Sequence, residues 1–350
     1  MILQSLSLEN FRCHRQTKTL EFADSTTIIT GENARGKTTL LEAVYMLSRG
    51  RGFREDEEIE LLSFGQEHGY VEGEYKVDNT TTKSSITYQR VGDSLTKRYI
   101  LGKTPVGLIR YRRAQTPVVL FAPHQIDIIV HGPSYRREYL DSVILAVDPT
   151  YTKVIREYES ALRKRNALLE DYTSIDALRK EIIFWNEYLV KRATVITEAR
   201  TKFIDYLNAH AQFAGRTFHV TYLANEMTIA RLEERFHVEA AAHRTLIGPQ
   251  KDDIEIMIRG DRGDISAHTY ASRSQQRLTL LYLKMHELDY VSEHLNDKPI
   301  LLLDDVYSEF DGANRHLISS LIPHYQTIVT TTEEIDLPTD IVRTAHKIGL

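Results

Sequence analysis

The sequence predicts an α/β fold, in which a mixed β-sheet surrounds a glycine-rich loop and a helical lobe is inserted into the chain. Three observations predict it. A glycine-rich segment joins an apolar β-run to a helical run at 28–47, helical periodicity replaces β-like alternation from about 133 to 215, and an apolar strand ends in two carboxylates at 299–305. The expected domains are the N-terminal part of the body, the helical lobe and the C-terminal part of the body, at 1–125, 126–216 and 217–350.

The glycine-rich segment has the spacing Gly-x-x-x-x-Gly-Lys-Thr of a P-loop. In such a loop backbone N–H groups wrap the phosphates of a nucleotide, Lys37 reaches the terminal phosphates, and the hydroxyl of Thr38 holds Mg²⁺. The helix that follows, from about Thr38 to Leu47, also turns the positive end of its dipole to the anion. The sequence therefore predicts ATP or GTP binding with Mg²⁺ by Gly31, Glu32, Asn33, Ala34, Arg35, Gly36, Lys37, Thr38 and Thr39.

The middle of the chain predicts two helices. Asp148 can cap the first, with Pro149 in its first turn. The second has an apolar seam close to a 3.5-residue repeat from Ile175 to Leu207, and Gly215 is a plausible stop. At 1.5 Å per residue it would reach roughly 50–60 Å, far short of an extended coiled-coil arm. Two interpretations stay open: a lobe that binds a partner, and a helical subdomain that only packs.

The C-terminal part predicts the other half of a nucleotide site. The strand at 299–305 resembles a Walker B motif, in which Asp304 would support the Mg²⁺ shell and Asp305 would polarise the attacking water. Residues 327–332 have the composition of another core strand. Its hydroxyls, that of Thr331 in particular, are expected near the γ-phosphate.

A serine lies at a helix start about 30 residues before the Walker B strand. The stretch 270–277 is a Ser-capped start with a polar first turn, and a helix from about Leu278 to Leu295 follows. ABC-type ATPases place a signature serine at such a position, where it meets ATP bound by a second subunit. Ser272 is the candidate. The order P-loop, insertion, signature, Walker B and threonine strand predicts an ABC/SMC-type ATPase head with an inserted helical lobe.

With these motifs the sequence resembles the RecF family, recombination mediators related to SMC-type ATPases, along nearly the whole chain. The segments that carry the resemblance are Leu8–Arg12, Gly31–Thr38, Leu41–Tyr45, Gly52–Arg54, Phe121–Pro123, Pro133–Asp141, Arg165–Leu169, Gly248–Asp253 and Asp304–Asp311. The resemblance implies a homodimeric ATP clamp on gapped DNA or on junctions of single- and double-stranded DNA. It implies slow ATP hydrolysis, and action with RecO and RecR in loading RecA. It also adds Arg12 to the nucleotide site, and Gln125, which stands where the family commonly has aspartate, is a candidate Q-loop contact to the metal.

Several positions depart from the family pattern. Ala34 replaces a P-loop glycine, and it would cost roughly 1 kcal/mol if the position needs a positive φ. Ser274 occupies the usual glycine of the signature, His124-Gln125 replaces Glu-Asp, and Gln250-Lys251 replaces His-Arg. We therefore expect secure ATP binding and a weak, DNA-stimulated ATPase.

Composition restricts the class of protein and leaves the DNA contacts open. The net charge of −5 argues against a uniformly basic nucleic-acid binder, and a single cysteine, Cys13, suits a reducing cytoplasm. No window of about 18 apolar residues predicts a membrane span. Basic clusters could still contact phosphates; the candidates for DNA are Arg112, Arg113, Arg51 and Arg54.

Three other functions are compatible with parts of this pattern. An ABC transporter subunit is disfavoured, because a helical lobe separates P-loop from signature and nothing implies a membrane partner. Another SMC-like head, nuclease-associated or defensive, shares these motifs, but the chain lacks a cysteine hook and long coiled coils. The third is a nucleotide switch that scaffolds partners without hydrolysis.

Overall fold

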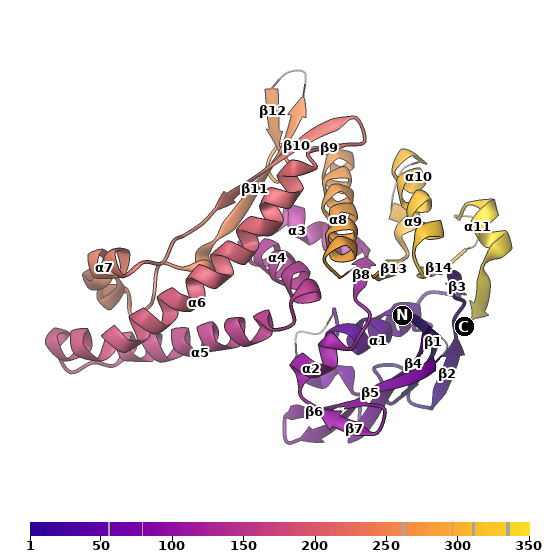
Figure 1. Ribbon diagram of the computed structural model, residues 1–350, viewed down its shortest axis with the longest axis horizontal. Helices are drawn as coiled ribbons and strands as arrows, with labels where there is room; N and C mark the ends of the chain where they lie inside the picture. Colours follow the sequence, from indigo (N-terminus) through magenta and orange to yellow (C-terminus); the bar gives the residue numbers. More distant parts are fainter. Residues whose placement is uncertain (55–56, 79, 261–262, 296, 310–311, 334–336) are drawn as a thin grey trace. The chain divides into compact units, whose positions relative to one another are not determined.

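The computed structural model describes residues 1–54, 57–78, 80–260, 263–295, 297–309, 312–333 and 337–350 (Figure 1). They form two compact units. Unit 1 comprises Met1–Gln125 and Glu287–Leu350, and unit 2 comprises Ile126–His286. The division falls after Gln125 and again after His286, and the expected domain bounds stay a prediction. The chain after residue 216 forms a sheet that packs on the long helix of unit 2.

The nucleotide motifs of unit 1 lie on a five-stranded parallel sheet with the strand order β15-β3-β14-β13-β8. Four of its strands are short runs that are buried on both faces, as is typical of parallel strands, whereas the edge strand β15 is largely exposed. Their bounds are β3 (Thr26–Thr30), β8 (Val118–Phe121), β13 (Ile300–Asp304), β14 (Thr327–Thr331) and β15 (His346–Gly349). The expected strands at 299–305 and 327–332 are thus present.

A second, antiparallel sheet completes unit 1, with the strand order β2-β1-β4-β5-β6-β7. Its strands alternate buried and exposed residues, since one face packs on the core. Helix α1 (Lys37–Arg49) contacts both sheets, and apolar residues of both form one core with it. The strands are β1 (Ile2–Glu9), β2 (Lys18–Glu21), β4 (His68–Val77), β5 (Thr80–Val91), β6 (Ser94–Leu101) and β7 (Thr104–Val106).

Short helices connect these strands. They are η1 (Glu58–Leu61), α2 (Leu108–Arg113), α9 (Val306–Glu309), α10 (Gly312–Leu321), η4 (Ile322–His324) and α11 (Thr339–Thr344). A further turn, η2 (Pro123–Ile126), lies at the division between the units, and α8 (Arg273–Leu295) begins in unit 2 and ends in unit 1.

Unit 2 is built on an antiparallel pair of helices, α5 (Tyr151–Glu170) and α6 (Ile175–Ala209), which run side by side in Figure 1. The predicted seam of α6 is buried at Leu178, Ile182, Leu189, Ala193, Ile196, Phe203 and Leu207. α6 ends at Ala209, earlier than the expected stop at Gly215, because the chain turns there into β9. At 1.5 Å per residue, the 35 residues of α6 span about 52 Å.

The rest of unit 2 packs around this pair. A four-stranded antiparallel sheet has the order β12-β11-β10-β9. The remaining elements are α3 (Asp127–Val130), α4 (Pro133–Val147), β9 (Gln212–Phe213), β10 (Arg216–Leu223), α7 (Ile229–Ala242), η3 (Pro249–Lys251), β11 (Asp253–Gly260) and β12 (Gly263–Ser266).

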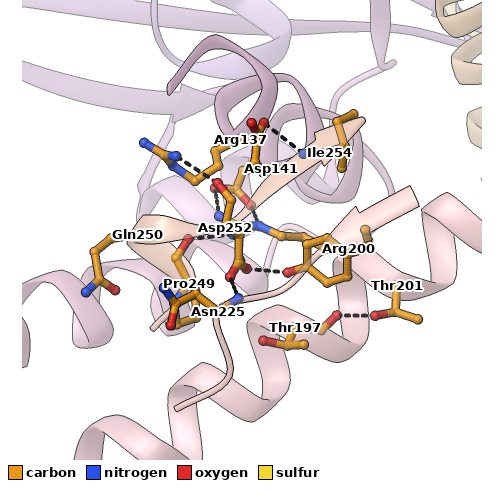
Figure 2. A network of polar contacts seen from close by, with 12 residues as sticks. Arg137, Asp141, Thr197, Arg200, Thr201, Asn225, Pro249, Gln250, Asp252 and Ile254 are labelled. Carbon is orange, nitrogen blue, oxygen red and sulfur yellow. Dashed lines mark hydrogen bonds and ion pairs between the residues drawn. The ribbon is translucent and has the colours of Figure 1, made fainter. Parts of the chain in front are cut away.

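A network of charged and polar contacts fixes the segment Gly248–Asp253 within unit 2 (Figure 2). Arg200 of α6 donates to the carbonyl of Pro249 and to Asp252 at 2.9 Å each, and to both carboxylate oxygens of Asp141 at 2.9 and 3.0 Å. Arg137 donates to the carbonyl of Asp252 at 2.8 Å. A guanidinium that is nearly excluded from water needs such partners. Three segments distant in sequence are thereby tied together.

A second buried pair joins α5 to α7. The side chain of Arg165 is 0% exposed and donates to Asn186, Thr245 and Glu239 at 2.7 Å each. Of the basic residues of this helix, Arg165 is therefore a core residue and no part of a basic surface.

Within the described residues, no helix is both long enough and apolar enough to cross a membrane.

Candidate functional site

The parallel sheet of unit 1 brings the predicted motifs to one edge. The P-loop follows β3, Asp304 ends β13, Thr331 ends β14, and Gln125 comes shortly after β8. Because these four strands are parallel neighbours, their carboxyl ends meet at the same edge. Ligands of open α/β sheets bind at that edge. The fold therefore assembles one nucleotide site from segments up to about 300 residues apart.

The P-loop conformation depends on its glycine at position 36. Gly36 has φ +91°, and a Cβ there would lie 2.7 Å from Nε2 of His14 and 2.8 Å from Sγ of Cys13. Backbone strain and steric contact both exclude a side chain. Ala34 has φ +65°, so this alanine adopts the left-handed conformation that favours glycine. The cost is about 1 kcal/mol.

A pocket of about 250 Å³ opens at the loop. Lys37 is buried in it, and its Nζ donates to the carbonyls of Gly31 at 2.7 Å and Glu32 at 3.0 Å. The lysine is thus folded over the loop that would wrap the phosphates. The residues that line the pocket are Cys13, Asn33, Ala34, Gly36, Lys37, Thr38, Thr39, Arg54, Asp304 and Asp305.

Walker A and Walker B are in direct contact. The hydroxyl of Thr38 donates to Oδ1 of Asp304 at 2.9 Å, although 266 positions separate them. Oδ1 also accepts a bond of 2.8 Å from Thr330, whose hydroxyl accepts the N–H of Asp305 at 3.1 Å. Asp305 itself has φ +50°. A hydroxyl beside a carboxylate, both at a P-loop, is the donor set that Mg²⁺ takes together with phosphates and water.

Thr330 was missed by the sequence interpretation, which singled out Thr331. The hydroxyl of Thr331 donates to the carbonyl of Glu333 at 2.9 Å, whereas Thr330 contacts the Walker B carboxylate. Alternation along β14 was the available signal, because side chains of successive strand residues point to opposite faces. The strand assignment alone did not say which face meets Asp304.

Glu42 is a second residue that the sequence interpretation missed. It lies on α1, its side chain is 0% exposed, and it pairs with both Arg12 and Arg54. Arg12, predicted in the nucleotide site, lies after β1 with φ +50° and donates from Nη2 to Glu42 at 2.8 Å. Arg54, whose contact with DNA stays a prediction, lines the nucleotide pocket.

Cys13 forms one side of the same pocket and is exposed. A hydrogen bond with the neighbouring His14 lowers the pKa of the thiol to about 7, and Thr39 contributes in the same direction while burial opposes it. The chain's single cysteine is therefore partly a thiolate at neutral pH.

Gln125 lies after β8 at the same sheet edge. Its side-chain oxygen accepts the N–H of Ala122 at 3.2 Å. That bond holds the glutamine over the end of its own strand, and its role in metal binding stays a prediction.

Ser272 forms the start of α8, in unit 2. Its hydroxyl accepts the N–H of Gln275 at 3.3 Å, and the side chain of Gln275 accepts the N–H of Ser272 at 2.8 Å. This reciprocal pair is a capping box. Ser272 is exposed, as a serine that meets a nucleotide on a second chain would have to be. Phe310 and Asp311, the last residues of the segment Asp304–Asp311 that carries the family resemblance, lie outside the described part of the chain.

The predicted DNA contacts differ in their surroundings. Arg112 is half-buried and donates from Nε to the carbonyl of Arg49 at 2.6 Å, and burial beside Arg49 and Arg51 lowers its pKa to about 10. Arg51 is also half-buried, whereas Arg113 is exposed. Arg112 therefore stabilises the fold around α2, and of the original candidates Arg113 presents its charge to solvent.

The chain matches a known protein family over nearly its full length. Residues 2–338 match the family model described as the RecF/RecN/SMC N-terminal domain. The chain is 32% identical to the DNA replication and repair protein RecF of Gloeobacter violaceus, over 95% of this chain and 92% of that protein. It is 30% identical to the RecF protein of Ruminiclostridium cellulolyticum, over 95% and 93%.

The chain belongs to the RecF family.

Solved structures agree with this assignment. A structure of the recombination mediator protein RecF-ATPrS in the RecFOR pathway superposes with a TM-score of 0.84 at 29% identity, covering 96% of this chain and 94% of that one. The RecF-ATP structure gives the same TM-score at 28% identity. An Smc head domain from Pyrococcus furiosus gives a TM-score of 0.53 at 16% identity, over 99% and 93%, and so shows the shared head fold. The expected ABC/SMC-type head is confirmed.

Proposed function

We propose that this RecF-family chain is an ATP-dependent DNA-binding clamp, which dimerises on ATP at gapped DNA or at junctions of single- and double-stranded DNA. The observation that carries the proposal is the pocket in which Lys37, Thr38 and Asp304 converge. A similar fold has been solved as RecF-ATP. RecO and RecR as partners, assistance in recombinase loading, and a cytoplasmic location complete the proposal.

Different residues of unit 1 are assigned to the phosphates, to the metal ion and to the attacking water. The P-loop amides and Lys37 bind the phosphates, and Thr38 and Asp304 hold Mg²⁺, which offsets the phosphate charge. Thr330 fixes the Asp304 carboxylate by its bond of 2.8 Å. Asp305 polarises the attacking water, and its backbone is held by the bond from its N–H to the Thr330 hydroxyl.

Hydrolysis is proposed to be slow and to need a second chain. Ser272, exposed at the N-terminus of α8, would meet the γ-phosphate held by the other subunit, where the helix dipole favours an anion. Ser274 adds a side chain in the same first turn, and Ala34 strains the P-loop. Both departures disfavour close approach to phosphate, so we expect weak turnover.

DNA is proposed to bind at the exposed basic side of α2. Arg110 and Arg113 are three residues apart on this helix, share a face and are exposed. Reversing both charges (Arg110→Glu with Arg113→Glu) should weaken binding and lower the salt slope by roughly 1 per lost phosphate contact. Arg235→Glu with Arg244→Glu changes the net charge equally at exposed positions of unit 2 and is the matched control. An unchanged slope in the α2 variant would rule out this surface.

The clamp is tested by sedimentation of the wild type and of Lys37→Met, with and without Mg-ATP and gapped duplex DNA. The proposal expects ATP to convert the wild type from monomer to a dimer that retains DNA, and the variant to stay monomeric. A wild type that binds ATP yet remains monomeric and ignores DNA would overturn it. ATP-dependent dimers without turnover, even with DNA, would instead favour the non-hydrolysing switch.

A further inference from the structure

Helix α1 carries a carboxylate in the interior of unit 1. Glu42 lies four residues after Thr38, one turn along the same helix, and its side chain is 0% exposed. An ionised carboxylate in such a place is costly unless it is paired and hydrogen-bonded. Its partners therefore indicate what the charge is retained for.

The partners come from two other segments that border the nucleotide pocket. Oε1 accepts the N–H of Phe53 at 3.2 Å and that of Arg54 at 3.0 Å, and Oε2 accepts Nη2 of Arg54 at 2.9 Å. Arg12 pairs with both oxygens and donates to Oε1 from Nη2 at 2.8 Å. One carboxylate thus joins the end of β1 and the segment after α1 to the P-loop helix.

This arrangement places a guanidinium in the lining of the nucleotide pocket. Arg54 lines the pocket, its Nη2 lies 3.3 Å from Oγ1 of Thr39, and about a third of its side chain is exposed. An arginine on a loop would otherwise sample many rotamers, at an entropic cost on binding. Because Glu42 and Lys37 belong to one helix, the bonds that Glu42 accepts from Arg54 fix this arginine relative to the P-loop lysine.

We propose that Glu42 is a positioning residue of the nucleotide site, which holds Arg54 where the phosphates bind. The proposal rests on nucleotide binding at the P-loop. If Glu42 acts by holding Arg54, a change at Glu42 should lower the affinity for nucleotide only when Arg54 is present. A purely structural role of Glu42 would lower the affinity whether or not Arg54 is present.

A double-mutant cycle tests this requirement. Glu42→Asp keeps the charge but withdraws the carboxylate by one methylene, and it is combined with Arg54→Gln. Affinity for ATPγS is measured by calorimetry, and folding is checked by thermal unfolding. Glu60→Asp is the matched control, because Glu60 is an exposed acid whose carboxylate lies 4.0 Å from Arg12, and the same methylene is removed.

Arg54→Gln should lower affinity about ten-fold, the range of one charge-assisted hydrogen bond. Glu42→Asp should lower it by a similar factor in the wild-type background and less than two-fold beside Arg54→Gln, with no change for Glu60→Asp. An equal loss in both backgrounds, or no loss, overturns the proposal. If Glu42→Asp does not fold, the isosteric Glu42→Gln enters the same cycle under the same criteria. A wild type that fails to bind ATPγS, or a Lys37→Met variant that binds normally, would instead refute the proposed function.

Discussion

The contact between Thr330 and Asp304 gives the most direct test of how the Walker B carboxylate is held. Thr330 is buried, and its hydroxyl donates to Oδ1 of Asp304 at 2.8 Å. Thr330→Val removes this bond without leaving a cavity, since the two side chains have nearly the same shape. The N–H of Asp305 keeps a partner, the Thr330 carbonyl at 3.1 Å.

The expected cost follows from these contacts. A hydrogen bond to a charged group contributes about 1.5–3 kcal/mol, and the buried methyl that replaces the hydroxyl returns about 0.8 kcal/mol. The net destabilisation is about 1.5 kcal/mol, or roughly 3–6 °C in the melting temperature of a unit of this size. The neighbouring Thr331 is equally buried but donates only to the carbonyl of Glu333, which is exposed. Thr331→Val should therefore cost close to nothing.

Scanning calorimetry is the appropriate measurement. The single tryptophan, Trp185, belongs to unit 2, so its fluorescence does not follow the unfolding of unit 1. Two transitions are expected, and only that of unit 1 should shift in Thr330→Val. If the two valine variants melt alike, the Asp304 carboxylate is not held by Thr330 and the reasoning fails.

Three further outcomes are expected. The rate of alkylation of Cys13 by iodoacetamide should rise with pH, with a midpoint near pH 7, because the pKa of the thiol is lowered to about 7. Mg-ATP should slow the alkylation in the wild type but not in Lys37→Met, since Cys13 lines the nucleotide pocket. Equal rates with and without ATP would place the nucleotide elsewhere. Burial, with His210 nearby, lowers the pKa of His286 to about 4. Below about pH 6.5 the folded state therefore binds fewer protons than the unfolded state. The free energy of unfolding should fall by roughly 2 kcal/mol as the pH drops to 4. His286→Gln should flatten that pH dependence in calorimetry, and an unaltered profile would contradict the assignment. Glu239→Ala should lower the free energy of unfolding by about 3–5 kcal/mol, because it leaves the buried Arg165 without its carboxylate partner. Glu233→Ala, whose partner Arg179 is exposed, should lower it by under about 0.5 kcal/mol. Trp185 fluorescence in urea measures both, and similar losses would argue against a buried pair.

Local sequence was sufficient to predict those features of the structure that depend only on neighbouring residues. The P-loop was predictable because its turn, its lysine and its helix start occupy fixed adjacent positions, and the capping box of Ser272 because it spans four residues. The seam of α6 followed from periodicity alone. These features depend on backbone hydrogen bonding and on the 3.6-residue repeat, both of which act over short distances in the chain.

Which polar groups meet was decided by the tertiary structure. In the sequence Arg165 follows Arg163 and Lys164, and Arg112 was a candidate for DNA. In the fold Arg165 is buried against Glu239, 74 positions away, and Arg112 donates to the carbonyl of Arg49. No sequence pattern indicated the role of Glu42, because the residues that pair with it come from other segments of the chain. A charge is solvated or paired according to what the fold brings beside it, and one residue along a strand reverses the face that a hydroxyl presents, as Thr330 and Thr331 show. By itself the sequence therefore determined the family, the nucleotide motifs and the principal helices, while the fold decided how the side chains of the site are held.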